Sequence, residues 1–276
     1  MQHLLLVDET FDLNFTQEYH LSIQFSLDGF SFCVRDGLQN KYIYLFHKEF
    51  SGNPKFTHRK LEDIYSEFDI LNAPFKTTQL LYSSPEKMVL IPEQFFDGAS
   101  ETENNQLNLS LAADEELIHI PVHSCHSVLE IAIQKKIKRF FEEKHPGTII
   151  QHEIINHLNA DSITKDSSSS MSIHLYKDQM IISFWNGSLR FLNSFKYQNE
   201  NDLLYYILNV VKTENWQDNI KIQLNGRVNK RSPIYHSLRQ YFKHVVIQTR
   251  RTDVYYSYLF DQLPDARFVN LLNNRS

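Results

Sequence analysis

The residues best suited to bind a metal gather in one short stretch. Three histidines and one cysteine lie within eight residues, at His119, His123, Cys125 and His126. Imidazole and thiolate groups are ligands that zinc prefers, but this spacing matches no compact zinc-finger pattern. The surrounding chain also has the pattern of an extended segment. We therefore expect these side chains to be ordinary surface and core residues, and we expect no metal site.

Motifs for other well-known reactions are missing. The sequence contains no Gly-x-Ser-x-Gly elbow, no Walker loop and no Cys-x-x-Cys pair. Two dipeptides have the residue types that tight turns favour, namely Asp28-Gly29 and Asn225-Gly226. Neither pair points to a reaction by its residue types alone.

Composition restricts the class of protein. The 276 residues are 42% hydrophobic and 13% aromatic, which is enough for a sizeable core in about two domains. Seven glycines and eight prolines are typical of a folded chain rather than a disordered one. Two cysteines form no disulfide framework, and the longest apolar runs are too short to span a membrane. We therefore expect a cytoplasmic protein.

The elements that could position a site follow a repeated order. Alternating apolar residues predict strands over 21–27, 30–34 and 42–46, with Asp28-Gly29 as a hairpin turn. The same strand, turn and strand pattern recurs over 171–184 and 188–192. Each unit is followed by a helical pattern and a further strand. Residues 8–18, with alternating Phe11, Leu13 and Phe15, predict an arm or edge strand.

This order predicts an α/β fold with two similar lobes. Three antiparallel strands that lead into helix-covered parallel strands are typical of a ribonuclease-H-like layout, and two such lobes form the actin-like architecture. We expect an N-terminal lobe over 1–165, with an acidic insert near 97–126, and a C-terminal lobe over 166–276. The serine-rich segment 160–170 is the expected linker.

Three features resemble an uncharacterised bacterial family, known mainly from Bacteroidetes, that has an actin-like ATPase fold. They are the stretch Tyr19-His20-Leu21-Ser22-Ile23-Gln24, the segment Leu90-Ile91-Pro92 with Phe95-Phe96, and the order of elements along nearly the whole chain. The resemblance implies a fold and no established activity.

The actin-like resemblance also implies where nucleotide motifs should stand. In such ATPases each first hairpin carries an Asp-x-Gly motif, but Gln24-Phe25-Ser26 and His174-Leu175-Tyr176 occupy those places here. A neutral glutamine is a poor ligand for Mg²⁺. A shifted alignment would use Asp28 and Gly29, and the glycine pair expected near adenosine is reduced to Asn225-Gly226. These four residues are the cofactor-binding candidates if a nucleotide binds, and we assign no catalytic residue.

Nuclease chemistry is also disfavoured, because strands 21–26 and 172–176 contain no carboxylate. We therefore expect a catalytically degenerate actin-like protein that acts as a binding or scaffolding module, without ATP or magnesium as a cofactor. One alternative is a nucleotide-binding ATPase or kinase with an atypical site. A second alternative is an RNA- or DNA-associated factor that uses the basic segment 221–252.

Charge is distributed unevenly along the chain. Residues 88–134 contain eight acidic residues and no Lys or Arg, whereas residues 221–252 contain eight basic residues and no Asp or Glu. Opposite patches steer association and set register. We therefore predict that Arg227, Lys230 and Arg231 bind an acidic partner protein or a second copy of the chain. Solvated surfaces, or lobes that attract each other, are the simpler interpretation of the same pattern.

Overall fold

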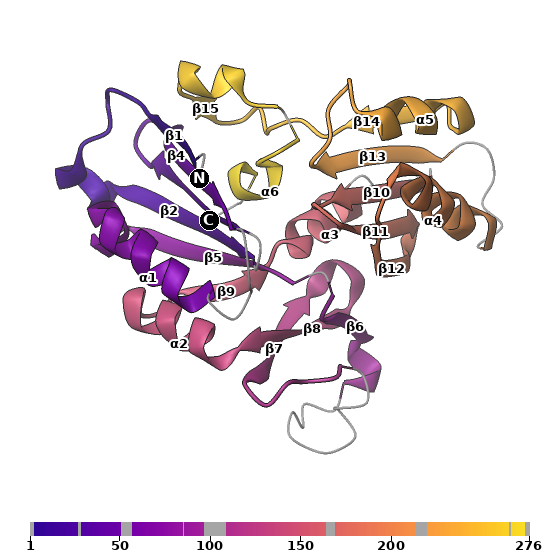
Figure 1. Ribbon diagram of the computed structural model, residues 1–276, viewed down its shortest axis with the longest axis horizontal. Helices are drawn as coiled ribbons and strands as arrows, with labels where there is room; N and C mark the ends of the chain where they lie inside the picture. The colour runs from indigo at the N-terminus through magenta and orange to yellow at the C-terminus, as the bar shows by residue number, and fades with distance from the viewer. Residues whose placement is uncertain are drawn as a thin grey trace.

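The computed structural model describes residues 3–26, 29–50, 57–84, 86–96, 109–163, 169–213, 220–264 and 266–273. Two larger sheets lie on either side of a central region, and a smaller sheet lies beside the first (Figure 1). No helix in the described ranges is long and apolar enough to cross a membrane. The expected linker residues 164–168 lie outside the described residues, so the lobe boundary near 165 stays a prediction.

The first sheet has seven strands, in the order β1-β4-β3-β2-β5-β9, with β15 beside β4. Strands β2, β3 and β4 form the predicted antiparallel unit, while β5 and β9 continue the sheet in parallel. The strands are β1 (His3–Val7), β2 (Tyr19–Ser26), β3 (Gly29–Asp36), β4 (Lys41–Glu49), β5 (Thr77–Ser83), β9 (Ile149–His152) and β15 (Tyr255–Tyr256).

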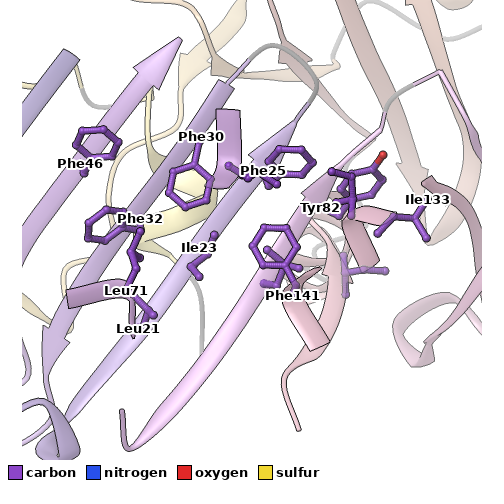
Figure 2. Packing of buried hydrophobic residues seen from close by; sticks show 14 of the residues in the cluster. Leu21, Ile23, Phe25, Phe30, Phe32, Phe46, Leu71, Tyr82, Ile133 and Phe141 are labelled. Carbon is purple, nitrogen blue, oxygen red and sulfur yellow. The ribbon is translucent and has the colours of Figure 1, made fainter. Parts of the chain in front are cut away.

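Both faces of this sheet are buried. On one face, Ile23, Phe25 and Phe32 pack against helices α1 (Thr57–Glu67) and α2 (Lys135–Lys144), and Figure 2 shows Phe141 of α2 beside Phe25. On the other face, Cys33 and Leu45 pack against the C-terminal end of the chain. Burial on both faces explains why residues 42–46 are apolar without alternation.

Residues 8–18, expected to form an arm or an edge strand, form no strand. Leu13–Glu18 forms a 3-10 helix, η1, and the edge strand is β1, which lies earlier in the chain. The carboxylate of Asp12 accepts a hydrogen bond from the backbone N–H of Asn14 at 2.9 Å and so caps this helix. The local side-chain capping outweighs the alternation of Phe11, Leu13 and Phe15.

A small antiparallel sheet is inserted between β5 and α2. Its order is β6-β8-β7, with β6 (Met88–Pro92), β7 (Glu115–Val122) and β8 (Ser127–Gln134). A short 3-10 helix, η4 (Glu93–Phe95), follows β6, and another, η6 (His123–Cys125), joins β7 to β8. Residues 97–108 of the expected acidic insert lie outside the described residues.

The second sheet has the order β12-β11-β10-β13-β14. Its first three strands form the second predicted antiparallel unit, and β13 and β14 run parallel to β10. The strands are β10 (Ser170–Leu175), β11 (Gln179–Asn186), β12 (Ser188–Lys196), β13 (Lys221–Gly226) and β14 (His244–Ile247). Helices α4 (Glu200–Thr213) and α5 (Pro233–Tyr241) pack on one face, and α3 (Ile154–Ile163) contacts β10 and β11.

The end of the chain returns to the first sheet. We call residues 249–264 and 266–273 the C-terminal strap. It contains β15, which pairs with β4, then the 3-10 helix η7 (Tyr258–Gln262) and the short helix α6 (Val269–Leu272). Phe260, Leu271 and Leu272 are buried against the first sheet, and Figure 1 shows α6 between the two larger sheets. The strap therefore joins the two halves of the molecule.

Candidate ligand-binding cleft

Both larger sheets direct the carboxyl ends of their parallel strands toward one cleft. Strands β2 and β5 end there at Ser26 and Ser83, and β10 and β13 end there at Leu175 and Gly226. In open α/β sheets, ligands usually bind in the crevice outside the carboxyl ends of strands. The lining residues of the cleft are Gln24, Ser26, Gly29, Ser31, His47, Ser83, His174, Leu175, Tyr176, Gly226, Arg227, Arg267 and Phe268.

The cleft is small. Its cavity volume is about 80 Å³, whereas sites that enclose drug-sized ligands occupy roughly 300–1,000 Å³. The described lining contains two arginines and no carboxylate. The space therefore suits the head of one side chain or a small oxyanion better than a whole nucleotide.

A buried carboxylate closes the base of this region. Glu153, which follows β9 directly, is fully buried and accepts hydrogen bonds from four side chains on different elements. Gln24 Nε2 donates to Oε2 at 2.7 Å and Ser83 Oγ donates to Oε1 at 2.5 Å. Asn270 Nδ2, in α6, donates to Oε2 at 2.8 Å, and the hydroxyl of Tyr176 donates to Oε1. One carboxylate thus links the first sheet, the second sheet and the strap.

The predicted cofactor-binding residues divide into three groups. Gly29 and Gly226 both line the cleft, so the structure brings these two residues together from different sheets. Asn225 is fully buried and its amide donates to Ser172 Oγ at 3.0 Å, so this side chain supports β10 rather than facing a ligand. Asp28 lies outside the described residues.

Gly226 is required by close backbone packing. Its φ of +82° is rare for other residues, and a Cβ atom there would lie 2.3 Å from the carbonyl oxygen of Leu175. The turn after β13 therefore needs a glycine for structural reasons alone.

Three buried histidines lie in or next to the cleft, and His174 is one of its lining residues. The rings of His157, in α3, and His174, in β10, have centroids 5.1 Å apart. Burial lowers the pKa of His174 to about 3, and burial together with the neighbouring His174 lowers the pKa of His157 to about 3. Burial also lowers the pKa of His152 to about 4. All three therefore remain neutral at pH 7.

The candidate metal ligands near residue 119 do not form a cluster. His119 Nε2 lies 3.0 Å from Glu130 Oε1, and His123 and Cys125 belong to η6. Burial raises the pKa of the Cys125 thiol above its ordinary value. Within the described ranges, no three His, Cys, Asp or Glu side chains are arranged to hold a metal ion.

The predicted partner-binding residues occupy the turn after β13. Lys230 and Arg231 are exposed, and no described residue forms an ion pair with either. Arg227, in contrast, donates from Nη2 to Glu49 Oε1 at 2.8 Å. Glu49 ends β4 of the first sheet, so Arg227 bridges the two sheets at the mouth of the cleft.

The basic segment 221–252 is not one continuous surface. Lys221 begins β13 and Lys243 precedes β14, so both lie at the opposite end of the second sheet from Arg227. Arg251 pairs with Asp253 in the strap, with Nε 2.7 Å from Oδ1. The acidic stretch is also partly neutralised, because Glu115 pairs with Lys87 and Glu116 pairs with Lys138.

Sequence reasoning missed Glu153, Glu49 and Arg267. A signal was present for Glu153, because a carboxylate directly after a parallel strand stands where ligands commonly bind. Glu49 and Arg267 gave no such signal, because Arg267 Nη2 reaches Glu49 Oε1, at 3.4 Å, only once the strap has returned to the first sheet.

Comparisons with known proteins place this geometry in context. The family model described as protein of unknown function (DUF3822) matches residues 8–245. No curated protein matches the chain. A crystal structure from Bacteroides thetaiotaomicron VPI-5482, of a protein with an actin-like ATPase fold and unknown function, is 21% identical with a TM-score of 0.79. The match covers 96% of this chain and 100% of that chain.

A second similar structure is that of the PilM-PilN type IV pilus biogenesis complex. It is 8% identical with a TM-score of 0.60, and the match covers 91% of this chain and 96% of that chain. Together with the two-sheet topology, the likeness to the Bacteroides structure shows that this chain has the predicted actin-like ATPase fold.

Proposed function

The chain belongs to the family of proteins of unknown function DUF3822, and we propose that it is a binding or scaffolding module with a degenerate actin-like cleft rather than an enzyme. The observation that carries this proposal is the set of four hydrogen bonds that Glu153 accepts from the chain's own side chains. They connect the two sheets and the strap through the chain's own side chains.

The residues around the cleft do not fit magnesium and ATP. Gln24 stands on β2 where the actin-like resemblance implies a carboxylate, and its amide is already bonded to Glu153. Tyr176 lines the cleft where the second motif should leave room for a phosphate. Mg²⁺ requires anionic oxygen ligands, and the nearest buried carboxylate has its acceptor positions occupied.

Protein binding is the activity that remains. One similar fold was solved as the PilM-PilN complex, so this shape is used elsewhere to hold another protein. Exposed Lys230 and Arg231, beside the mouth of the cleft, offer positive charge that could steer a partner toward it.

A nucleotide-binding protein with an atypical site is the second candidate. The observation in its favour is that Gly29 and Gly226 line the same cleft from different sheets, which allows a ligand to approach the backbone closely. The small cavity and the lack of a described carboxylate in its lining weigh against this function.

Thermal unfolding with and without ATP and Mg²⁺ separates the two candidates. A ligand that binds only the folded protein stabilises it by about 2.7 kcal/mol at 100 times its dissociation constant. We expect no shift in Tm at millimolar ATP with magnesium, and no ATP turnover above a buffer blank. A saturable shift together with turnover would contradict the proposal.

A further inference from the structure

Glu49 pairs with two arginines at the mouth of the cleft. Three nitrogen atoms from three different elements approach the same carboxylate oxygen, Oε1. Arg227 Nη2, after β13, lies at 2.8 Å, and Arg267 Nη2, in the strap, lies at 3.4 Å. His47 Nε2, on β4, lies at 3.8 Å, which is too far for a hydrogen bond, and this atom has no hydrogen-bond partner among the described residues. Two guanidinium groups that converge on one carboxylate oxygen are typical of a site that recognises an acidic group.

The site is accessible from solvent. The side chains of Glu49, Arg227 and Arg267 are 48%, 40% and 40% exposed. Glu49 is therefore held at the surface rather than locked into the core. Exposed ion pairs contribute about 0–1 kcal/mol, so an external carboxylate can replace Glu49 at little cost.

The cavity beyond Glu49 is built to receive polar groups. Ser26, Ser31 and Ser83 place hydroxyl groups in its lining, and Gly29 and Gly226 leave the backbone uncovered. His174 also lines it, is only 7% exposed, and has no hydrogen-bond partner for Nδ1 among the described residues. A buried polar atom without a partner is costly, which indicates a place for a further polar group.

We propose that Arg227 and Arg267 form a docking site for an acidic side chain of a partner protein, and that Glu49 occupies this site until the partner displaces it. The proposal rests on the binding-module function given above and specifies the chemistry of the partner. Charge complementarity supports an acidic segment, because Arg227 and Arg267 share the single carboxylate of Glu49, and Lys230 and Arg231 beside them are exposed. The cavity of about 80 Å³ has room for a side-chain head but not for a nucleotide.

The mechanism makes Glu49 an internal competitor. When a binding site is open for only a fraction of the time, the apparent affinity falls by that fraction. Replacing the carboxylate of Glu49 by an amide removes the competing charge and leaves the side-chain size unchanged. Affinity for an external carboxylate should then rise, whereas a purely structural ion pair predicts no gain.

The test is the binding of a fluorescein-labelled Gly-Glu repeat peptide, measured by fluorescence polarisation on the full chain. We expect Glu49→Gln to bind it roughly tenfold more tightly than the wild type, which corresponds to Glu49 filling the site about nine-tenths of the time. The control is Glu67→Gln, because Glu67 is also 48% exposed and also forms an ion pair, with Lys48 Nζ 3.3 Å from its Oε2. Neither residue lines the cleft. This control should leave the affinity unchanged.

Two further arms make the result specific. Arg227→Ala with Arg267→Ala should abolish the gain, and a Gly-Gln peptide should not bind. Lys230→Ala with Arg231→Ala should weaken peptide binding only modestly, because these residues supply long-range attraction. Circular dichroism should confirm that every variant is folded.

Three outcomes would overturn the proposal: equal affinity of wild type and Glu49→Gln, peptide binding that survives loss of both arginines, or a gain seen with inorganic phosphate but not with the peptide. The last result would assign the site to a small free anion. None of these outcomes depends on ATP, so failure here is distinguishable from failure of the binding-module proposal.

Discussion

The hydroxyl of Tyr176 donates a hydrogen bond to the buried carboxylate of Glu153. Tyr176 follows the first strand of the second sheet, and Glu153 follows the last parallel strand of the first sheet. This bond therefore connects the carboxyl ends of the two sheets directly. Gln24, Ser83 and Asn270 donate to the same carboxylate. Removal of this carboxylate should therefore weaken the contact between the two sheets and the strap.

Replacing Glu153 should destabilise the protein strongly. Glu153→Ala leaves buried donors without a partner, each at a cost of about 1–3 kcal/mol, so we expect a loss of several kcal/mol in the free energy of unfolding. Tyr176→Phe removes a single hydrogen bond and should cost about 1 kcal/mol. Urea denaturation measures both. Tyr205→Phe, on the exposed face of α4, is the control and should cost nothing measurable. A Glu153→Ala variant as stable as the wild type would show that the network does not hold the lobes.

The turn after β13 should not tolerate a side chain at Gly226. Gly226 and Gly187 both have positive φ, +82° and +72°, but only at Gly226 would a Cβ meet other atoms, with Leu175 O at 2.3 Å. Gly187→Ala should therefore cost about 1–2 kcal/mol from backbone strain alone, and Gly226→Ala should cost clearly more. Thermal unfolding of the two variants measures the difference. Equal losses would show that the packing against Leu175 is unimportant.

Stability should fall as the pH drops from 6.5 toward 5. Burial lowers the pKa of His157 and of His174 to about 3, while an unfolded histidine titrates near pH 6.5. Between these values the unfolded chain binds more protons than the folded chain, so acid favours unfolding. The groups that face His174 are His157, Tyr176, Asn225 and Gly226, and none of them carries a positive charge in this range.

Replacing one of these histidines should reduce that pH dependence. The replaced histidine no longer binds a proton in the unfolded chain. The slope of the unfolding free energy against pH should therefore fall by about 1.4 kcal/mol per pH unit. Urea titrations of His174→Asn at pH 5, 5.5 and 6 measure the slope. Gln240→Asn, on the exposed face of α5, changes no titrating group and should leave the slope unchanged. An unaltered slope in His174→Asn would mean that this histidine is already protonated in the folded protein.

The two hairpin units could be predicted from the sequence because their signals are local. Alternating Leu21, Ile23 and Phe25 mark a strand with one face in the core, and the structure confirms the strand and its burial. Helix α2 carries the same kind of local signal, since Ile137, Phe140 and Phe141 recur at helical spacing and are all buried. Such periodicities need no knowledge of distant contacts.

The junction and the strap could not be predicted, because their contacts join residues far apart in the chain. The role of Glu153 depends on the hydrogen bonds that it accepts from Gln24 and Asn270, which lie 129 and 117 positions away in the chain. Arg227 was interpreted as a free docking residue because Glu49, 178 positions earlier, gave no sign of pairing with it. The return of β15 to β4 rests on two residues, too few to show a pattern.

The distance between the two sheets tests whether the hydrogen bonds to Glu153 fix them relative to each other. Spin labels at Glu62, on the exposed side of α1, and Gln240, on the exposed side of α5, would report this distance by pulsed electron resonance. Cys125→Ser provides the background, since Cys33 is fully buried.

We predict one narrow distance distribution without ligand, the same distribution with ATP and Mg²⁺, and a broad one after Glu153→Ala. A broad distribution in the unliganded wild type that narrows when ATP and Mg²⁺ are added would contradict the account, because it would show a cleft that a nucleotide closes.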